Sequence, residues 1–335
     1  MRLKEKKVAV IGGGSWATAI VRMLLDNRES KDLYWWMRSE EARNSIIKDG
    51  RNPNYLSAVQ IDIEPENISN DINYIIEKSN IIILCVPAAF LIETLSSLNP
   101  ESLQGKIVVS AIKGIVPETN QIIGEYLQVE YNIPVNDIAV ISGPCHAEEV
   151  SQRKLSYLTL GSQATEVAEL IASLLHTSYI KTTISEDIYG IEYAAVLKNI
   201  YAIASGICHG VGFGDNFQAV LISNAIREMA SLLNVVHPIQ RDINESAYLG
   251  DLLVTGYSQF SRNRTFGNMI AKGYTVRSAQ LEMNMVAEGY YASKCIHSII
   301  KELELDLPIC RAVYAVLYEK HSPTVEARLL AELLN

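Results

Sequence analysis

A short apolar run near the start of the chain leads directly into a glycine cluster, and this feature constrains the fold most. Residues 7–11 read Lys-Val-Ala-Val-Ile, and Gly12, Gly14 and Ala17 follow with the spacing G-x-G-x-x-A. In a strand–loop–helix unit the first glycine permits a tight turn, the second lets backbone approach a pyrophosphate, and the small third residue lets the helix pack on the strand. The hexapeptide alone is weak evidence. At the first strand of a strand–helix series it predicts a dinucleotide-binding loop at a helix N-terminus.

The first 185 or so residues form such a series. Short, β-branched apolar runs alternate with amphipathic segments of helical period, which is typical of parallel strands buried on both faces by crossover helices. We expect strands at 7–11, 33–36, 81–86, 106–111, 138–142, 157–161 and 179–183. We expect helices at 16–26, 88–98, 118–127 and 165–176. This order predicts an α/β fold with a doubly wound Rossmann sheet, whose ligand lies at the carboxyl ends of the strands.

From about Glu186 onward the strand-like runs stop and long helical patterns follow, so this half is expected to be all-α. A chain of 335 residues is long enough for two domains. We expect a dinucleotide-binding Rossmann domain at 1–185 and an all-helical substrate-binding and catalytic domain at 186–335.

Composition narrows the range of partners. Lys and Arg total 29 against 38 Asp and Glu, a net charge of -9, and such a surface repels nucleic acid and anionic lipid. No apolar run reaches the roughly 18 residues that cross a bilayer, and no signal peptide is recognisable. The five cysteines form no C-x-x-C pair and the six histidines show no metal-ligand spacing. We expect a cytoplasmic chain with reduced thiols and with no metal, nucleic-acid partner or membrane span.

The end of the second expected strand bears on the choice of dinucleotide. An acidic residue there usually holds the 2'-hydroxyl of the adenosine ribose of NAD, yet this strand ends in Met37-Arg38. Glu40 and Glu41 lie further on and are expected to open the next helix. Arg38 offers a guanidinium for a 2'-phosphate or for stacking on adenine, although a surface arginine without a ligand is the alternative. The sequence therefore predicts that NADP(H) is at least tolerated.

Lys198 is the most informative residue of the second half. It lies in a helix pattern at 188–208 that is apolar on all sides, which predicts a central, buried helix. Burial disfavours the ammonium form, and a pKa moved from about 10.4 towards 7 or 8 would make the amine a proton donor and acceptor near neutral pH. The alternative is a structural ion pair with Glu192 or with an acid elsewhere. His209 is an alternative acid-base group, although its position directly before Gly210 is typical of a helix end.

Three further segments carry polar groups at expected element ends. Lys113 follows the strand at 106–111, on the edge where the sheet should place its ligand, although a solvated loop lysine is equally compatible. Cys145 lies in a turn that runs into a helix start, and no base partner supports covalent thiol chemistry there. Ser261 is expected to cap a helix that begins with Arg262, an arrangement suited to a phosphate, with a solvated basic helix start as the alternative.

These motifs together resemble those of the bacterial-type NAD(P)-dependent glycerol-3-phosphate dehydrogenases. The shared motifs are Gly12-x-Gly14-Ser15-Trp16-x-Thr18-Ala19, Lys113-Gly114, Ile141-Ser-Gly-Pro144, Leu197-Lys198-Asn199, Gly250-Asp251-Leu252, Ser261-Arg262-Asn263-Arg264 and Val286-x-Glu288-Gly289. They extend over nearly the whole chain. The resemblance implies reversible reduction of dihydroxyacetone phosphate to sn-glycerol 3-phosphate with NAD(P)H, a supply of glycerol 3-phosphate for phospholipid synthesis, and a homodimer.

Matched position by position, the resemblance implies that Lys198 is the acid-base residue. It implies cofactor contacts from Gly12, Gly14, Ser15, Trp16, Arg38, Lys113, Ala147, Arg262, Val286 and Glu288. It implies substrate contacts from Lys113, Gly143, Cys145, Lys198, Asp251, Ser261, Arg262 and Asn263. The chain departs from the family at Cys145, where Ser or Thr is usual, at His146, where an aromatic residue is usual, and at Met37-Arg38, which shifts by one position from the commoner aromatic-x-Arg.

Two other kinds of protein fit part of the pattern. A β-hydroxyacid dehydrogenase would share the two-domain plan but would take a carboxylate in place of the phosphate. A non-catalytic dinucleotide-sensing regulator would keep the glycine loop but would not need a buried proton donor. A structural interaction protein would leave the expected cations without a role.

Overall fold

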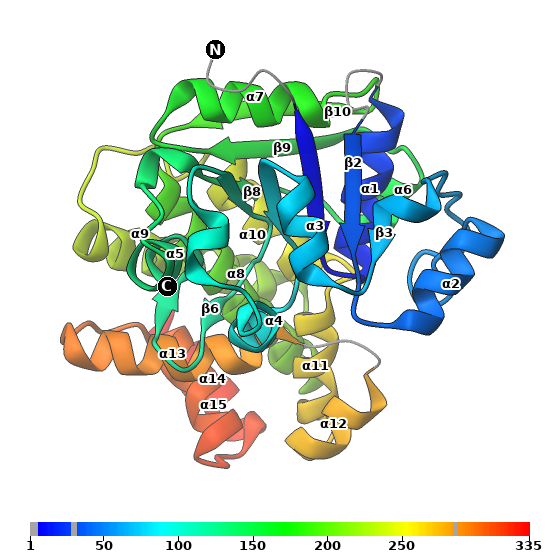
Figure 1. Ribbon diagram of the computed structural model, residues 1–335. Helices are drawn as coiled ribbons and strands as arrows, with labels where there is room; N and C mark the ends of the chain where they lie inside the picture. Colours follow the sequence, from blue (N-terminus) through cyan, green and yellow to red (C-terminus); the bar gives the residue numbers. More distant parts are fainter. Residues whose placement is uncertain (1–5, 28–31, 284–286) are drawn as a thin grey trace. The chain divides into compact units, whose positions relative to one another are not determined.

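The computed structural model describes residues 6–27, 32–283 and 287–335 (Figure 1). The chain forms two compact units. Unit 1 comprises Met1–Ile112 and Ile123–Ile188, and unit 2 comprises Lys113–Ile122 and Tyr189–Asn335. The sequence analysis divides the chain at a single point near residue 186. The structure differs in that residues 113–122 belong with the helices of unit 2.

Unit 1 is built on an eight-stranded sheet in the order β10-β9-β8-β5-β4-β1-β2-β3. Its strands are β1 (Lys7–Ile11), β2 (Asp32–Trp36), β3 (Ile68–Ser69), β4 (Ile81–Leu84), β5 (Ile107–Ser110), β8 (Ile138–Ser142), β9 (Ser156–Gly161) and β10 (Ile180–Ser185). Neighbouring strands run parallel except β8 and β9, which are antiparallel. The predicted doubly wound α/β sheet is confirmed, all seven expected strands are present, and the reversal at β9 was not expected.

Helices cover both faces of this sheet. They are α1 (Ser15–Asp26), α2 (Glu40–Asp49), α3 (Ile72–Lys78), α4 (Leu91–Leu95), α5 (Ile123–Tyr131), α6 (Ala147–Ser151) and α7 (Thr165–Leu175), with short 3₁₀ turns η1 (Pro65–Asn67), η2 (Ala88–Phe90), η3 (Pro100–Leu103) and η4 (Val135–Asp137). Val8 and Val10 of β1 join one buried cluster with side chains of α1 and α7. All residues of β4, β5 and β8 are buried, which explains why these strands read as continuous apolar runs.

The predicted helix at 118–127 is wrong in its first half. Gln121–Ile122 forms strand β7, which pairs antiparallel with β6 (Ile115–Val116), and α5 begins only at Ile123. Asn120 closes the intervening turn with φ of 57°, a left-handed conformation that asparagine tolerates. The spacing of apolar residues cannot distinguish a two-residue hairpin strand from the first turn of a helix. For this reason the sequence pattern predicts a helix here.

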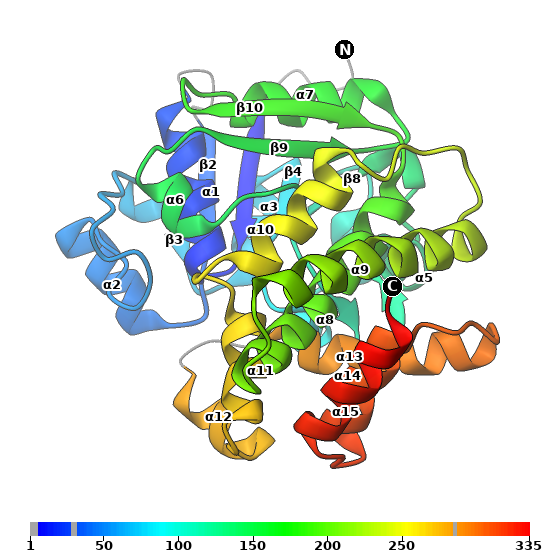
Figure 2. The same ribbon diagram turned by 180° about the vertical axis from the view of Figure 1, so that it is seen from behind.

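Unit 2 is helical apart from this hairpin. Its helices are α8 (Ile188–Gly210, counted in unit 2 from Tyr189), α9 (Asp215–Val236), the π-turn η5 (Ser246–Gly250), α10 (Asp251–Tyr257), α11 (Arg262–Ala271), α12 (Val276–Glu282), α13 (Glu288–Glu302), α14 (Pro308–Tyr318) and α15 (Pro323–Leu333). Every residue of α8 from Gly190 to Cys208 is buried, so the predicted central helix is confirmed. Both views show α13, α14 and α15 side by side, and α14 contacts each of the other two (Figure 2).

Within the described residues, α9 is the helix that is long and apolar enough to cross a membrane by length and composition. Of its most apolar stretch, 39% is buried inside the structure. The buried carboxylate of Glu228, in the middle of α9, accepts hydrogen bonds from the backbone N–H groups of Ile309 (2.6 Å) and Cys310 (3.3 Å). A side chain that satisfies the free amides at the start of α14 ties α9 to a neighbouring helix of the same unit.

Helices α8 and α11 pack very closely, because a glycine of each helix lies against the backbone of the other. A Cβ atom added at Gly267 of α11 would lie 2.1 Å from the carbonyl oxygen of Ile203 on α8, and one added at Gly206 would lie 2.0 Å from that of Arg264. Both distances are far below van der Waals contact, so these two positions require glycine. The close approach fixes the register of α8, which carries Lys198, against α11, which begins with Arg262.

We therefore expect Gly267→Ala to lower the free energy of unfolding by about 2 kcal/mol, because overpacking outweighs the better helix propensity of alanine. Gly214→Ala is the matched control, since a Cβ there meets nothing within 4 Å. Its loss should stay below about 1 kcal/mol. Urea denaturation of both variants measures the difference, and equal losses would contradict the close-packing argument.

Candidate active site

The glycine loop of unit 1 has the geometry that its sequence predicts. Gly12 follows β1 with φ of 140°, and a Cβ there would lie 2.3 Å from the carbonyl oxygen of Cys85, just after β4. Gly14 caps the N-terminus of α1, and a Cβ there would meet no atom within 4 Å. The loop thus lies between β1 and β4, at the point where the strand order reverses, and its backbone at Gly14 is open to a ligand.

Three donors hold the carbonyl groups of this loop. The Trp35 indole Nε1 donates to the Gly12 oxygen (2.6 Å), the Asn52 Nδ2 donates to the Gly13 oxygen (3.0 Å), and Thr18 donates to the Gly14 oxygen (2.9 Å). No acidic side chain lies in the first turn of α1, so nothing there opposes an anion at the positive end of the helix. Ser15 and Trp16 are the first two residues of this helix. These residues fit the pyrophosphate of a dinucleotide.

Asn52 is a functional candidate that the sequence analysis missed. Its side chain is fully buried, and Nδ2 also donates to Thr18 Oγ1 (2.9 Å). We expect Asn52→Ala to weaken NADPH binding about tenfold, because the Gly13 carbonyl loses its anchor and the loop becomes less preorganised. Fluorescence titration of NADPH measures this, with Asn54→Ala as the neighbouring control. A dissociation constant within about twofold of wild type would contradict the role of Asn52.

Arg38 lies two residues beyond β2, and its side chain is exposed. Its guanidinium carbon is 6.0 Å from the centre of the Phe90 ring in η2. Glu40 and Glu41 open α2, which Ser39 caps by accepting a hydrogen bond from the N–H of Ala42, so the prediction that these acids begin the next helix is confirmed. A cation at the end of β2 suits a 2'-phosphate.

The turn after β8 contains three more of the expected site residues. Gly143 has φ of 111°, and a Cβ there would lie 2.8 Å from the carbonyl oxygen of Tyr157. The Cys145 thiol donates to that same oxygen with an Sγ–O distance of 2.9 Å. Ala147 is the first residue of α6. The thiol is therefore engaged by backbone of the adjacent strand β9.

Two lysines of unit 2 share one buried carboxylate. Lys198 Nζ lies 2.5 Å from Asp251 Oδ1, and Lys113 Nζ lies 3.2 Å from Asp251 Oδ2. Lys198 is 4% exposed and Asp251 is 1% exposed. Asp251 begins α10 directly after the π-turn η5, a type of turn that is frequent at functional sites. The cluster thereby brings together three parts of unit 2: the segment before β6, helix α8 and the start of α10.

Burial and charge act in opposite directions on these groups. Desolvation and, to a smaller extent, the charge of Lys113 lower the pKa of Lys198, the charge of Asp251 opposes them, and the resulting pKa is about 7. Burial acts to raise the pKa of Asp251, but the two ammonium groups hold that pKa below its usual value. The result is an ionised carboxylate beside an amine that exchanges a proton near neutral pH.

Side-chain amides surround this cluster. Asn199 Nδ2 donates to the Lys113 carbonyl oxygen (2.6 Å), and Asn263 Nδ2 donates to Asn199 Oδ1 (2.9 Å). Ser261 caps α11 by accepting a hydrogen bond from the N–H of Arg264 (3.3 Å), as the sequence predicts. Arg262 begins α11 with an exposed side chain, and Glu288 begins α13. Val286 lies outside the described residues.

The structure thus gathers the expected residues into two groups, each within one unit. Unit 1 holds the glycine loop, Arg38 and the turn at 143–147, and unit 2 holds Lys113, Lys198, Asp251 and the start of α11. The sequence analysis missed Asn52 and Trp35. Their partners are distant in sequence, and only the turn-forming Asn52-Pro53-Asn54 gave a local signal.

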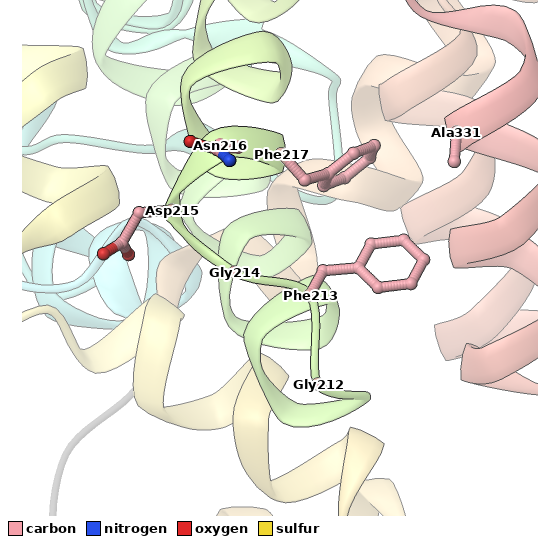
Figure 3. Close-up of a pocket in the computed structure, with 7 residues that line it drawn as sticks. All are labelled: Gly212, Phe213, Gly214, Asp215, Asn216, Phe217 and Ala331. Atoms are coloured by element: carbon pink, nitrogen blue, oxygen red, sulfur yellow. The ribbon is translucent and has the colours of Figure 1, made fainter.

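A separate pocket lies in unit 2 between the α8–α9 connection and α15. It is lined by Gly212, Phe213, Gly214, Asp215, Asn216, Phe217 and Ala331, and the rings of Phe213 and Phe217 point towards Ala331 (Figure 3). None of the residues singled out in the sequence analysis as site residues lines it. Across the described parts of the chain, no three His, Cys, Asp or Glu side chains are grouped as a metal ion would require.

Comparison with known proteins assigns both halves of the sequence to one family. Residues 7–168 match the family described as NAD-dependent glycerol-3-phosphate dehydrogenase N-terminus, and residues 187–327 match the corresponding C-terminus family. A glycerol-3-phosphate dehydrogenase [NAD(P)+] from Chlorobium phaeobacteroides is 36% identical over 98% of this chain and 97% of its own length. One from Oceanobacillus iheyensis is 34% identical over 95% of this chain and 91% of its own length.

A solved structure gives the same result. The glycerol-3-phosphate dehydrogenase from Coxiella burnetii superposes with a TM-score of 0.90 at 27% identity, covering 98% of this chain and 99% of that one. Both halves of the sequence, the glycine loop and the buried lysine–aspartate cluster thus lead to one conclusion. The chain belongs to the NAD-dependent glycerol-3-phosphate dehydrogenase family.

Proposed function

We propose that the chain interconverts dihydroxyacetone phosphate and sn-glycerol 3-phosphate by hydride transfer with NAD(P)(H). The observation that carries the proposal is the buried Lys198 amine, whose pKa is about 7 and which lies 2.5 Å from a carboxylate that it shares with Lys113. Family membership supports the choice of substrate. A regulator that only senses a dinucleotide has no use for such a group.

The nicotinamide, when bound, supplies or accepts the hydride. Lys198 moves the proton: in reduction its ammonium form protonates the ketone oxygen, and in oxidation its neutral form removes the proton of the C2 hydroxyl. Asp251 stays ionised, because two lysines hold its pKa low, and it orients the Lys198 amine. Lys113 supplies a second positive charge beside the developing alkoxide.

The remote phosphate of the substrate is assigned to the start of α11. Arg262 offers a guanidinium to the phosphate. The first backbone N–H groups of α11, at the helix N-terminus that Ser261 caps, offer further hydrogen-bond donors. As the family resemblance implies, we propose Asp251, Asn263, Gly143 and Cys145 as further substrate contacts. Anchoring the phosphate orients the reacting carbon, so its binding energy contributes to turnover as well as to affinity.

The cofactor is assigned to the glycine loop with Ser15, Trp16 and Arg38, with Ala147, Lys113, Arg262, Val286 and Glu288 as further contacts. Arg38 occupies the place where an acid would select NAD, so we propose that NADPH is preferred or at least tolerated as a cofactor. By these roles residues 1–185 form the NAD(P)-binding domain, and residues 186–335, with Lys113, form the substrate-binding and catalytic domain.

The pH dependence follows from the pKa of Lys198, which is about 7. Reduction needs the protonated amine, so kcat/KM for dihydroxyacetone phosphate should fall about tenfold per pH unit above this value. Oxidation needs the neutral amine and should fall by the same factor per unit below it. Initial rates in both directions between pH 5 and 9, at about constant ionic strength, measure the two limbs. If the rates of reduction and oxidation changed with pH in the same direction, the role of Lys198 would be contradicted.

The decisive assay follows oxidation of NADPH and NADH in parallel, with dihydroxyacetone phosphate and with unphosphorylated dihydroxyacetone. We expect turnover with the phosphate ester and at least about 100-fold lower kcat/KM without it. Turnover of a 3-oxo acid instead would make the protein a β-hydroxyacid dehydrogenase. Tight NADPH binding with no ketone reduced would make it a dinucleotide sensor.

The cellular setting is part of the proposal. We assign the enzyme to the cytoplasm and its product to phospholipid synthesis. We also propose a homodimer. A row of exposed apolar side chains on α15, Val325, Leu329 and Leu333, supports self-association and is tested by sedimentation of the wild type and of Leu329→Glu. A monomeric wild type would exclude the dimer.

A further inference from the structure

We propose that Ser205 and Gln218 are positioning residues that act on the active site through α10, the helix that begins with Asp251. The proposal rests on the proposed function and concerns three groups, named here the α10 tether: the Ser205 hydroxyl, the Gln218 amide and the Gly256 carbonyl. None of these groups is assigned to the cofactor or to the substrate. The tether holds the far end of α10 and thereby sets where the Asp251 carboxylate lies.

The tether joins three helices of unit 2 by buried hydrogen bonds. The Ser205 hydroxyl on α8 lies 2.7 Å from the carbonyl oxygen of Gly256 on α10 and 2.8 Å from Oε1 of Gln218 on α9. Gln218 Nε2 donates in turn to the Ser205 carbonyl oxygen (3.0 Å). Ser205 is 1% exposed and Gln218 is 3% exposed. Away from water, a group that loses its partner here is costly to leave unpaired.

The Ser205 backbone fixes the orientation of the Gln218 amide. A backbone carbonyl can only accept, so Gln218 must turn Nε2 to it and Oε1 to the hydroxyl. The single proton of the hydroxyl is therefore shared between two acceptors, Gln218 Oε1 and the Gly256 carbonyl oxygen, as a three-centre hydrogen bond. Gln218 thus keeps the Ser205 hydroxyl at its contact with α10.

The end of α10 is where such a donor is needed, because the last four carbonyl groups of a helix have no partner within it. The N–H of Phe260, which lies one turn after Gly256, donates to Ser258 Oγ (3.1 Å). Ser205 supplies a donor at this end of the helix. A Cβ at Gly256 would lie 2.8 Å from Ile222 Cδ1, so the end of α10 is also packed closely against α9.

Two attachments on one side of α8 define the position of α10. Lys198 and Ser205 are seven residues apart, about two turns, so they project from the same side of α8. Lys198 Nζ lies 2.5 Å from Asp251 Oδ1 at the start of α10, and Ser205 meets Gly256 near its end. Thr255 Oγ1 donates to the Asp251 carbonyl oxygen (2.6 Å) and connects the two ends. Because α10 has only seven residues, freeing its end should let Asp251 withdraw from Lys198.

The sign of the effect follows from the charge of Asp251. Burial and the charge of Lys113 lower the pKa of Lys198, the charge of Asp251 opposes them, and the pKa is about 7. Loss of the tether weakens the contribution of Asp251, so the pKa of Lys198 should fall. Reduction would then lose part of its proton donor at neutral pH.

Titration of Lys198 in the full chain tests the tether. NMR of lysine labelled at Nζ gives the titration midpoint, which we expect Ser205→Ala to lower by about half a pH unit. Ser293→Ala is the matched control, because this serine is also 1% exposed but donates to the Tyr290 carbonyl oxygen of its own helix (2.8 Å). The control should keep the midpoint within about 0.2 pH unit of wild type. An unchanged midpoint in Ser205→Ala, or an equal fall in Ser293→Ala, would overturn the proposal.

Combined variants distinguish positioning of Asp251 from general damage. In an Asp251→Asn background the tether has no charge to position, so adding Ser205→Ala should move the Lys198 midpoint by less than about 0.2 pH unit. A further fall of about half a unit would show that Ser205 acts by another route and would overturn the proposal. Gln218→Met removes the amide at nearly constant length and should lower the midpoint in the same direction. Combined with Ser205→Ala, it should add nothing to the fall that Ser205→Ala causes alone, and additive falls would overturn the tether.

Ser205→Cys guards against misfolding, because a thiol has nearly the size of a hydroxyl but is a weaker donor. If Ser205→Ala does not fold by circular dichroism, Ser205→Cys replaces it, with an expected fall of about 0.3 pH unit. A midpoint that does not move would then overturn the proposal. If the wild type fails to reduce dihydroxyacetone phosphate, the proposed function fails, while the titration, which needs no turnover, still decides on the tether.

Discussion

Lys198→Ala is expected to lower turnover of dihydroxyacetone phosphate at least about 100-fold, because the site loses the group that protonates the ketone oxygen. NADPH binding should stay near normal, since the glycine loop of unit 1 does not include this residue. Steady-state kinetics measures the first effect and fluorescence titration the second. Activity within a few-fold of wild type would end the assignment of Lys198 as the acid-base residue.

Lys198→Arg separates proton transfer from charge. Arginine keeps the positive charge beside Asp251, but its guanidinium stays protonated, so it cannot exchange a proton near neutral pH. We expect it to be nearly as inactive as the alanine variant. Lys294→Ala, which removes an exposed lysine of α13, serves as the control and should be fully active. An active Lys198→Arg would show that charge alone suffices.

Asp251→Asn is the second large effect that we expect. The change removes the charge that opposes desolvation of Lys198, so the pKa of Lys198 should fall below about 7 by at least one unit. At pH 7 few amines would then carry a proton, and both lysines would lose their shared anchor. We expect kcat/KM for reduction to fall about 30-fold and the midpoint of its pH profile to move to lower pH.

The direction of this shift distinguishes mechanism from instability. Glu228→Gln, which changes a buried carboxylate of the same unit that accepts from backbone amides, should leave the midpoint in place. A midpoint that stays fixed in Asp251→Asn, or that moves to higher pH, would contradict the electrostatic role of Asp251. A general loss of folded protein would lower the rate at every pH without moving the midpoint.

Local patterns predicted most of the sheet. Strands β4, β5 and β8 are buried on both faces, and their continuous apolar runs located them within two residues. The reversal of β9 could not be found in this way, because an apolar strand reads alike in either direction. The hairpin β6–β7 was missed because each strand has only two residues, too few for a period to appear.

The candidate site, too, was predicted only in part from local sequence patterns. The apolar surroundings of Lys198 predicted its burial, but its counter-charge was left open between Glu192 and an acid elsewhere. Six residues along a helix turn a side chain through about 600°, so Glu192 faces a different side of α8 from Lys198. The partner is Asp251 on α10, and Lys113, which shares that carboxylate, lies 138 residues from it in the chain.

The sequence by itself determined the glycine loop, the alternation of strands and helices, and the burial of the helix that carries Lys198. These properties depend on neighbouring residues, through turn geometry and the period of apolar side chains. Only the tertiary structure decided which carboxylate meets the two lysines, which side chains hold the glycine loop, and which groups hold the end of α10. Such contacts join residues far apart in the chain, and packing brings them together.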